Sequence, residues 1–162
     1  MDPEPFSFTP LFDSTLITGA IGLLVLLICS ALISGAEVAL FSLTQKDLDE
    51  AKNSTSKSFE IIIELLKQPK KLLASILVAN NFINIAIVIL FASLSEILFS
   101  EVHSELNLGF FKIDLVFFIE VILITFLILM IGEILPKVYA NRNNLKFSKF
   151  MAYPLKVLDV II

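Results

Sequence analysis

Three long apolar stretches alternate with polar or mixed segments along this chain. They cover approximately residues 16–41, 72–99 and 113–136. A helix of about 20 mostly apolar residues is long enough to cross the hydrocarbon core of a bilayer. The pattern therefore predicts an all-α membrane protein with three transmembrane helices, which together form a single transmembrane domain over residues 1–162.

The segments that follow the first and third stretches are amphipathic rather than uniformly polar. Residues 43–68 divide at a polar run, 53–58, which supplies helix caps, and the part after it mixes apolar side chains with Glu and Lys. Pro69 suits the first turn of the next span. Residues 143–160 have a similar pattern, which predicts a second surface helix, broken at Pro154. We expect both segments to form a belt of juxtamembrane helices.

An alternative for residues 143–160 is the beginning of a fourth span. Three lysines within eleven residues weigh against it, because charged side chains are costly in a bilayer: Lys146, Lys149 and Lys156.

Basic residues are unevenly distributed between the two ends of the spans. None precedes the first span, six lie in the first connection, one lies in the second and five lie in the tail. Lys and Arg accumulate in cytoplasmic loops. The distribution predicts an N-terminus outside and a cytosolic C-terminus, with residues 100–112 as a solvated outer loop.

The composition excludes several functional classes. Hydrophobic residues make up 57% of the chain and the mean hydropathy is +0.90. No basic patch is interleaved with aromatic residues as in single-strand binders, so nucleic-acid binding is not expected. The chain has one His and lacks both His-Glu-x-x-His and Gly-x-Ser-x-Gly, so we do not expect an enzyme.

Polar residues recur within the apolar stretches. Glu133 lies in the third, and a carboxylate at membrane depth usually faces an ion pathway or a protein partner. Ser30 and Ser34 are four residues apart in the first stretch, as are Asn80 and Asn84 in the second, so each pair shares one helix face. Together these residues predict a cation site between the helices. The alternatives are that each Ser bonds to its own backbone and that each Asn only joins helices.

The donor types favour a hard cation. Carboxylate, amide and hydroxyl oxygens suit Mg²⁺, whereas a soft site would need several Cys or His residues. Pro136 removes the helix hydrogen bond to the carbonyl of Gly132, and a carbonyl freed in this way can bind a cation where it lines a cavity. The alternative is that Pro136 simply marks the end of the helix.

Three motifs carry a resemblance to a known family. They are Ser-Gly-Ala-Glu-Val-Ala-Leu at 34–40, Leu-Val-Ala-Asn-Asn-Phe-Ile-Asn at 77–84 and Gly-Glu-Ile-Leu-Pro-Lys at 132–137. In this order they resemble the motifs of the CorC/CNNM family of magnesium transporters. Ala79 departs from the pattern, because the family often has Gly there.

The resemblance implies Mg²⁺ as the transported ion, with Na⁺-driven export. It implies that the side chains of Ser30, Ser34, Asn80, Asn84 and Glu133 bind a dehydrated Mg²⁺, together with the backbone of Gly132. It further implies a homodimer in a bacterial inner membrane. The family normally continues into cytosolic CBS domains that bind ATP-Mg, so we expect this chain to be a membrane domain cut from a longer protein.

Two further acidic residues, Glu37 and Glu120, lie within the predicted spans. Glu37 and Lys137 lie near the cytosolic ends of their spans and could form a structural ion pair. Glu120 is too far along the helix to share an ion with Glu133, and is expected to face an outer vestibule or a partner.

The alternative to transport is a membrane scaffold or accessory subunit of a surface, secretion or motility machinery.

Overall fold

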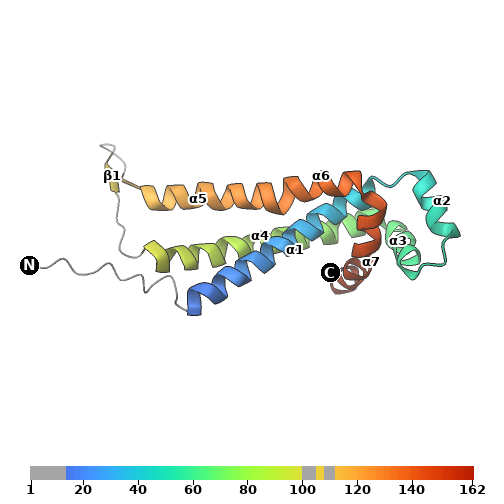
Figure 1. The fold of residues 1–162 in the computed structure, drawn as a ribbon, viewed down its shortest axis with the longest axis horizontal. Coiled ribbons are helices and arrows are strands. Elements are labelled where there is room, and N and C mark those ends of the chain that lie inside the picture. Colours follow the sequence, from blue (N-terminus) through green and yellow to red (C-terminus); the bar gives the residue numbers. More distant parts are fainter. Residues whose placement is uncertain (1–13, 100–104, 108–111) are drawn as a thin grey trace, which may run out of the picture.

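Three long helical segments run side by side in the computed structural model, which describes residues 14–99, 105–107 and 112–162 (Figure 1). All three are long and apolar enough to cross a membrane, which confirms the predicted all-α, three-span class. The third segment is interrupted by a π-helix. The segments are α1 (Ser14–Phe41), α4 (Pro69–Phe99), and the series α5 (Leu115–Leu127), η2 (Ile128–Ile134) and α6 (Leu135–Arg142).

The side chains that the spans direct outward are apolar. Ile21, Phe82 and Phe117, for example, are 59%, 74% and 64% exposed. A large continuous apolar surface of this kind is rare on a soluble monomer. Lipid tails are the solvent that this surface fits.

Two short strands lie between the second and third spans, in the connection that was predicted to be a plain loop. β1 (Glu105–Asn107) pairs antiparallel with β2 (Lys112–Asp114). The pairing brings the chain back toward the start of α5. We call this end of the bundle, where α1 begins and α4 ends, the hairpin end.

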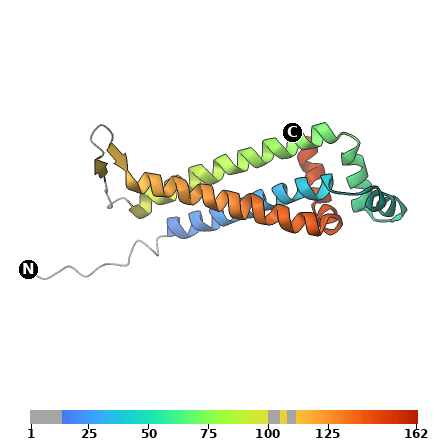
Figure 2. The same cartoon turned by 90° about the horizontal axis from the view of Figure 1, so that it is seen from above.

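Three shorter helices gather at the opposite end, which we call the belt end (Figure 2). They are α2 (Gln45–Asn53), α3 (Lys57–Leu66) and α7 (Asn144–Ile161). The apolar face of α3 is buried rather than laid on the surface, because it packs with α1, α4 and α7 into one core. This core contains Leu40, Ile62, Leu72, Ile76 and Leu155, each at most 1% exposed.

The belt also carries ion pairs that link α7 to its neighbours. Lys71 pairs with Asp159 at 3.1 Å and Lys156 pairs with Glu64 at 3.0 Å. Exposed pairs of this kind contribute about 0–1 kcal/mol each. The apolar core therefore contributes most of the stabilisation that holds α7 against its neighbours.

The predicted break at Pro154 is wrong, because α7 continues through it. Pro154 cannot donate to the carbonyl of Phe150, four residues earlier. Both residues lie on the exposed face, where water or lipid headgroups can satisfy that carbonyl. The opposite face holds the helix in place through Met151, Ala152 and Leu155, which are buried.

The fourth-span alternative is also not supported within the part of the chain that the structure describes. Three helices there meet the length and hydropathy of a span, and α7 is not among them. It lies across the belt end and contacts α1, α3 and α4 (Figure 1).

The helix α2 lies in the first part of the predicted belt segment 43–68, before the polar run, and it begins at a capping box. The Thr44 hydroxyl accepts from the Asp47 backbone N–H, and the Asp47 carboxylate accepts from both the hydroxyl and the backbone N–H of Thr44. Both hydrogen bonds from Thr44 lower the pKa of Asp47, the one from its side chain more than the one from its backbone N–H. This reciprocal pair explains why a helix of low hydrophobicity starts at this position.

Candidate functional site

Hydrogen bonds between polar side chains link all three spans midway along the bundle. Ser30 of α1 is fully buried, and its hydroxyl donates to Oδ1 of Asn84 at 2.8 Å and to Oδ1 of Asn80 at 3.2 Å. The Nδ2 of Asn84 in turn donates to Oε1 of Glu133 at 3.3 Å. The structure thus brings together four of the residues that the sequence singled out.

These contacts decide between the two hypotheses for Ser30. In the structural alternative, the serine hydroxyl donates to a backbone carbonyl of its own helix. Ser30 instead donates to a different helix, to residues 50 and 54 positions away in the chain. Asn81, adjacent to Asn80, is exposed and lies outside this set.

A π-helix presents Glu133 and Gly132 to this network. The segment η2 spans Ile128–Ile134, and the backbone N–H of Leu135 donates to the carbonyl of Met130, five residues earlier. Single turns of π-helix occur often at functional sites. Because α6 continues to Arg142, the alternative that Pro136 ends the helix is wrong. Pro136 falls in the first turn of α6.

Gly132 allows η2 to approach α1 closely. A Cβ atom placed on Gly132 would lie 3.0 Å from Oγ of Ser30, tighter than most side-chain contacts in proteins. The backbone of Gly132 therefore lies against the serine hydroxyl. Its carbonyl receives no hydrogen bond from Pro136, which has no N–H.

Ser34 lies one turn from Ser30 and has a different environment. Its side chain is fully buried, and its hydroxyl has no hydrogen-bond partner. A buried polar group without a partner costs about 1–3 kcal/mol, so few are found in native proteins and each needs an explanation. A cation bound by the Ser34 oxygen would explain why this hydroxyl has no partner in the protein.

The spacing of the oxygens fits a small, hard cation. Mg²⁺ binds oxygens at about 2.0–2.1 Å in an octahedron, which places neighbouring ligands about 2.9 Å apart. The Ser30 oxygen lies 2.8 and 3.2 Å from the two Asn oxygens. These are also hydrogen-bond distances, and in this structure the hydroxyl of Ser30 uses them to donate to the two asparagines.

The donor set contains one carboxylate. Within the described residues no group of three or more His, Cys, Asp or Glu could hold a metal ion. A cation at this site would therefore depend on neutral oxygens and on the single negative charge of Glu133.

Two flanking features of the motifs have structural roles. Lys137 of α6 pairs with Glu37 of α1 at 3.5 Å, toward the belt end of the site, so the predicted ion pair is present. Ala79 is 7% exposed on α4, and its methyl group takes part in the packing of that helix. Neither residue hydrogen-bonds to the network of Ser30, Asn84 and Glu133 in this structure.

Comparisons with known proteins agree on one family. The family model described as the cyclin M transmembrane N-terminal domain (CNNM) matches residues 21–162. A UPF0053 protein of Haemophilus influenzae is 31% identical over 139 residues, which cover 84% of this chain and 29% of the relative. The UPF0053 inner membrane protein YfjD of Escherichia coli is 26% identical over 132 residues, which cover 80% and 28%. This chain thus spans less than a third of the length of either relative.

Proposed function

Because this chain belongs to the CNNM family of membrane proteins, we propose that it transports Mg²⁺ across the membrane through a site between its three spans. The ligands are the side-chain oxygens of Ser30, Ser34, Asn80, Asn84 and Glu133, with the backbone carbonyl of Gly132. The observation that carries the proposal is the link from Ser30 through Asn84 to Glu133, which joins α1, α4 and η2. A site that uses all three spans can change affinity when one of them moves.

The unpartnered hydroxyl of Ser34 supports a ligand rather than a purely structural network. Among the described residues, Ser34 and Ser148 are buried hydroxyls without a partner; Ser34 lies one turn from Ser30, beside the network that links the three spans, whereas Ser148 lies on α7. A bound cation gives the Ser34 oxygen an interaction and repays its desolvation. Rigid helices that already face one another also lower the entropic cost of binding.

The wider setting of the proposal follows from the charge distribution and from the family. Eleven of the twelve basic residues lie at the belt end and one, Lys112, lies at the hairpin end, which supports a cytosolic belt end and C-terminus and an N-terminus outside. We place the protein in a bacterial inner membrane as a homodimer, with Na⁺ as the coupling ion for export and no enzymatic activity. Cytosolic CBS domains that bind ATP-Mg would follow in the longer protein.

Mg²⁺ flux in proteoliposomes tests the function, with variants chosen from one helix. Asn84→Ala removes an oxygen of the site, whereas Asn81→Ala removes the same group from an exposed position three residues away. We expect Asn84→Ala to lower the rate at least tenfold and Asn81→Ala to retain it. Wild-type protein without flux would favour the scaffold alternative, and equal rates for the two variants would exclude this site.

A further inference from the structure

A second carboxylate lies within the third span, well away from the site described above. Glu120 of α5 is partly buried and accepts a hydrogen bond from the hydroxyl of Ser95 on α4, which is 3% exposed. A charge within a span is costly, and such residues usually mark an ion or proton pathway. The proposed Mg²⁺ site leaves this pair without a function.

The pair of Glu120 and Ser95 lies nearer the hairpin end than the first site and has the same arrangement of donor and acceptor. Both use a polar side chain of α4 that donates to a carboxylate of the third span: Asn84 to Glu133, and Ser95 to Glu120. Asn84 and Ser95 are eleven residues apart, just over three full turns, so they lie on one face of α4, separated by about 16 Å. The two pairs form two polar levels along one helix interface.

An apolar cluster fills the space between these levels. It consists of Leu27, Ile87, Ile124 and Ile128, each at most 9% exposed, with Phe91 packed against it. A bare cation does not cross such a cluster, because nothing there replaces its hydration shell. The cluster separates the level of Glu120 and Ser95 from the site at Glu133.

Two other hydroxyls at the hairpin end, those of Thr18 and Ser93, have a different arrangement. A groove of about 550 Å³ lies there between α1 and α4. Two of its hydroxyls, from Thr18 and Ser93, donate to carbonyls of their own helices, four residues earlier. They are satisfied locally, whereas Ser95 reaches across to a carboxylate on another span.

We propose that Glu120 and Ser95 form a second hard-cation site, at which Na⁺ or Mg²⁺ binds at the hairpin end before or after it crosses the apolar cluster. The inference rests on the proposed transport function. One carboxylate and one hydroxyl leave most of the coordination sphere to water, so the ion at this level keeps part of its hydration shell. Na⁺ and Mg²⁺ share this chemistry with oxygen donors.

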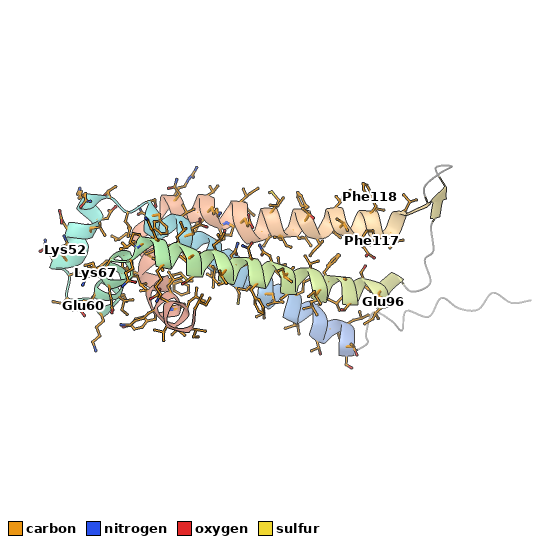
Figure 3. The ribbon with its side chains drawn as sticks, turned by 180° about the vertical axis from the view of Figure 1, so that it is seen from behind. Lys52, Glu60, Lys67, Glu96, Phe117 and Phe118 are labelled. Carbon is orange, nitrogen blue, oxygen red and sulfur yellow. The ribbon has the colours of Figure 1, made fainter. Side chains whose placement is uncertain are left out.

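The test compares Glu120→Gln with Glu96→Gln. Glu96 follows Ser95 on α4 and is exposed at the hairpin end, so it provides a matched control (Figure 3). Mg²⁺ flux is measured in right-side-out and inside-out membrane vesicles while Na⁺ or Mg²⁺ is varied on one side at a time. The Mg²⁺-dependent rise in melting temperature of the purified protein reports on the site at Glu133.

We expect Glu120→Gln to raise the half-saturating concentration of Na⁺ or of Mg²⁺ at least tenfold on one side of the membrane only. The rise in melting temperature with Mg²⁺ should stay as in wild type, and Glu120→Asp should recover most of the effect. The ion whose half-saturation shifts identifies the occupant.

Three results would overturn the second site. In the first, Glu120→Gln matches Glu96→Gln in every flux measurement. In the second, it loses stability and Mg²⁺ binding together, which indicates a structural role. In the third, only the dependence on external pH changes, which assigns a proton instead. If the wild-type protein carries no flux, the transport proposal falls as well, whereas flux unaffected by Glu120→Gln removes the second site alone.

Discussion

At the scale of single residues, two serines of one helix face have opposite situations. Ser30 and Ser34 are both fully buried, but Ser30 donates to two asparagines whereas Ser34 has no partner. Removing a satisfied hydroxyl leaves its acceptors unpaired, and removing an unsatisfied one relieves a desolvation cost. Substitution of the two serines is therefore expected to change the free energy of unfolding in opposite directions.

We predict that Ser34→Ala raises the free energy of unfolding in the absence of divalent cations by about 1 kcal/mol or more, and weakens Mg²⁺ binding. Ser30→Ala is the matched control, because helix propensity changes equally in both variants. It should lower the free energy of unfolding, because Asn80 and Asn84 lose the hydroxyl that donates to them. Denaturant unfolding in detergent, with EDTA and with Mg²⁺, measures both effects. A loss of cation-free stability in Ser34→Ala equal to that in Ser30→Ala would contradict the account.

Much of the candidate site could be predicted at this scale. Ser30, Asn80, Asn84 and Glu133 were found because polar residues are conspicuous within apolar stretches and because a spacing of four places them on one face. Their mutual contacts involve positions about fifty residues apart, which no local pattern encodes. Ser95 was missed, since a single serine in a span carries no signal until its partner, Glu120, is known.

At the scale of elements, the π-helix is the feature that shapes the site. It changes which side chains of the third span face α1 and α4, because its turn contains more residues than an α-helical one. The sequence showed only Pro136 and Gly132, four residues earlier, which fit an interrupted helix and a helix end equally well. The structure shows the interrupted helix, because η2 is followed directly by α6, which continues to Arg142.

We predict that Gly132→Ala weakens Mg²⁺ binding at least tenfold, although it removes no ligand. The added methyl group would lie 3.0 Å from the Ser30 oxygen and displace it from Asn84. Gly22→Ala is the control, since a methyl group there would make an ordinary 3.4 Å contact with Leu90. Isothermal titration with Mg²⁺ compares the two, and unchanged affinity in Gly132→Ala would show that this close approach is dispensable.

The belt helices show where local rules failed for a different reason. Pro154 was expected to break α7, as it would an isolated helix. The burial of Met151 and Leu155 against α3 and α1 outweighs the one hydrogen bond that is lost. Sequence patterns predict which segments are amphipathic more reliably than they predict which tertiary contacts will hold them.

At the scale of the whole molecule, one bundle contains two polar levels separated by apolar packing. The core at the belt end fixes α1 and α4 to α3 and α7. The cluster around Ile87 closes the bundle between the level of Glu133 and that of Glu120. A movement of the third span relative to the other two would change both levels, and the contacts of α7 link the belt to α1 and α4.

The most direct test of the central claim is the melting temperature of Glu133→Gln with and without millimolar Mg²⁺. The glutamine keeps the shape and an oxygen for Asn84, but not the negative charge. A ligand that binds only the folded state stabilises it by mass action, about 2.7 kcal/mol at a hundredfold excess over Kd. We predict a Mg²⁺-dependent rise for wild type and none for Glu133→Gln. An equal rise in both proteins would contradict the assignment of the site.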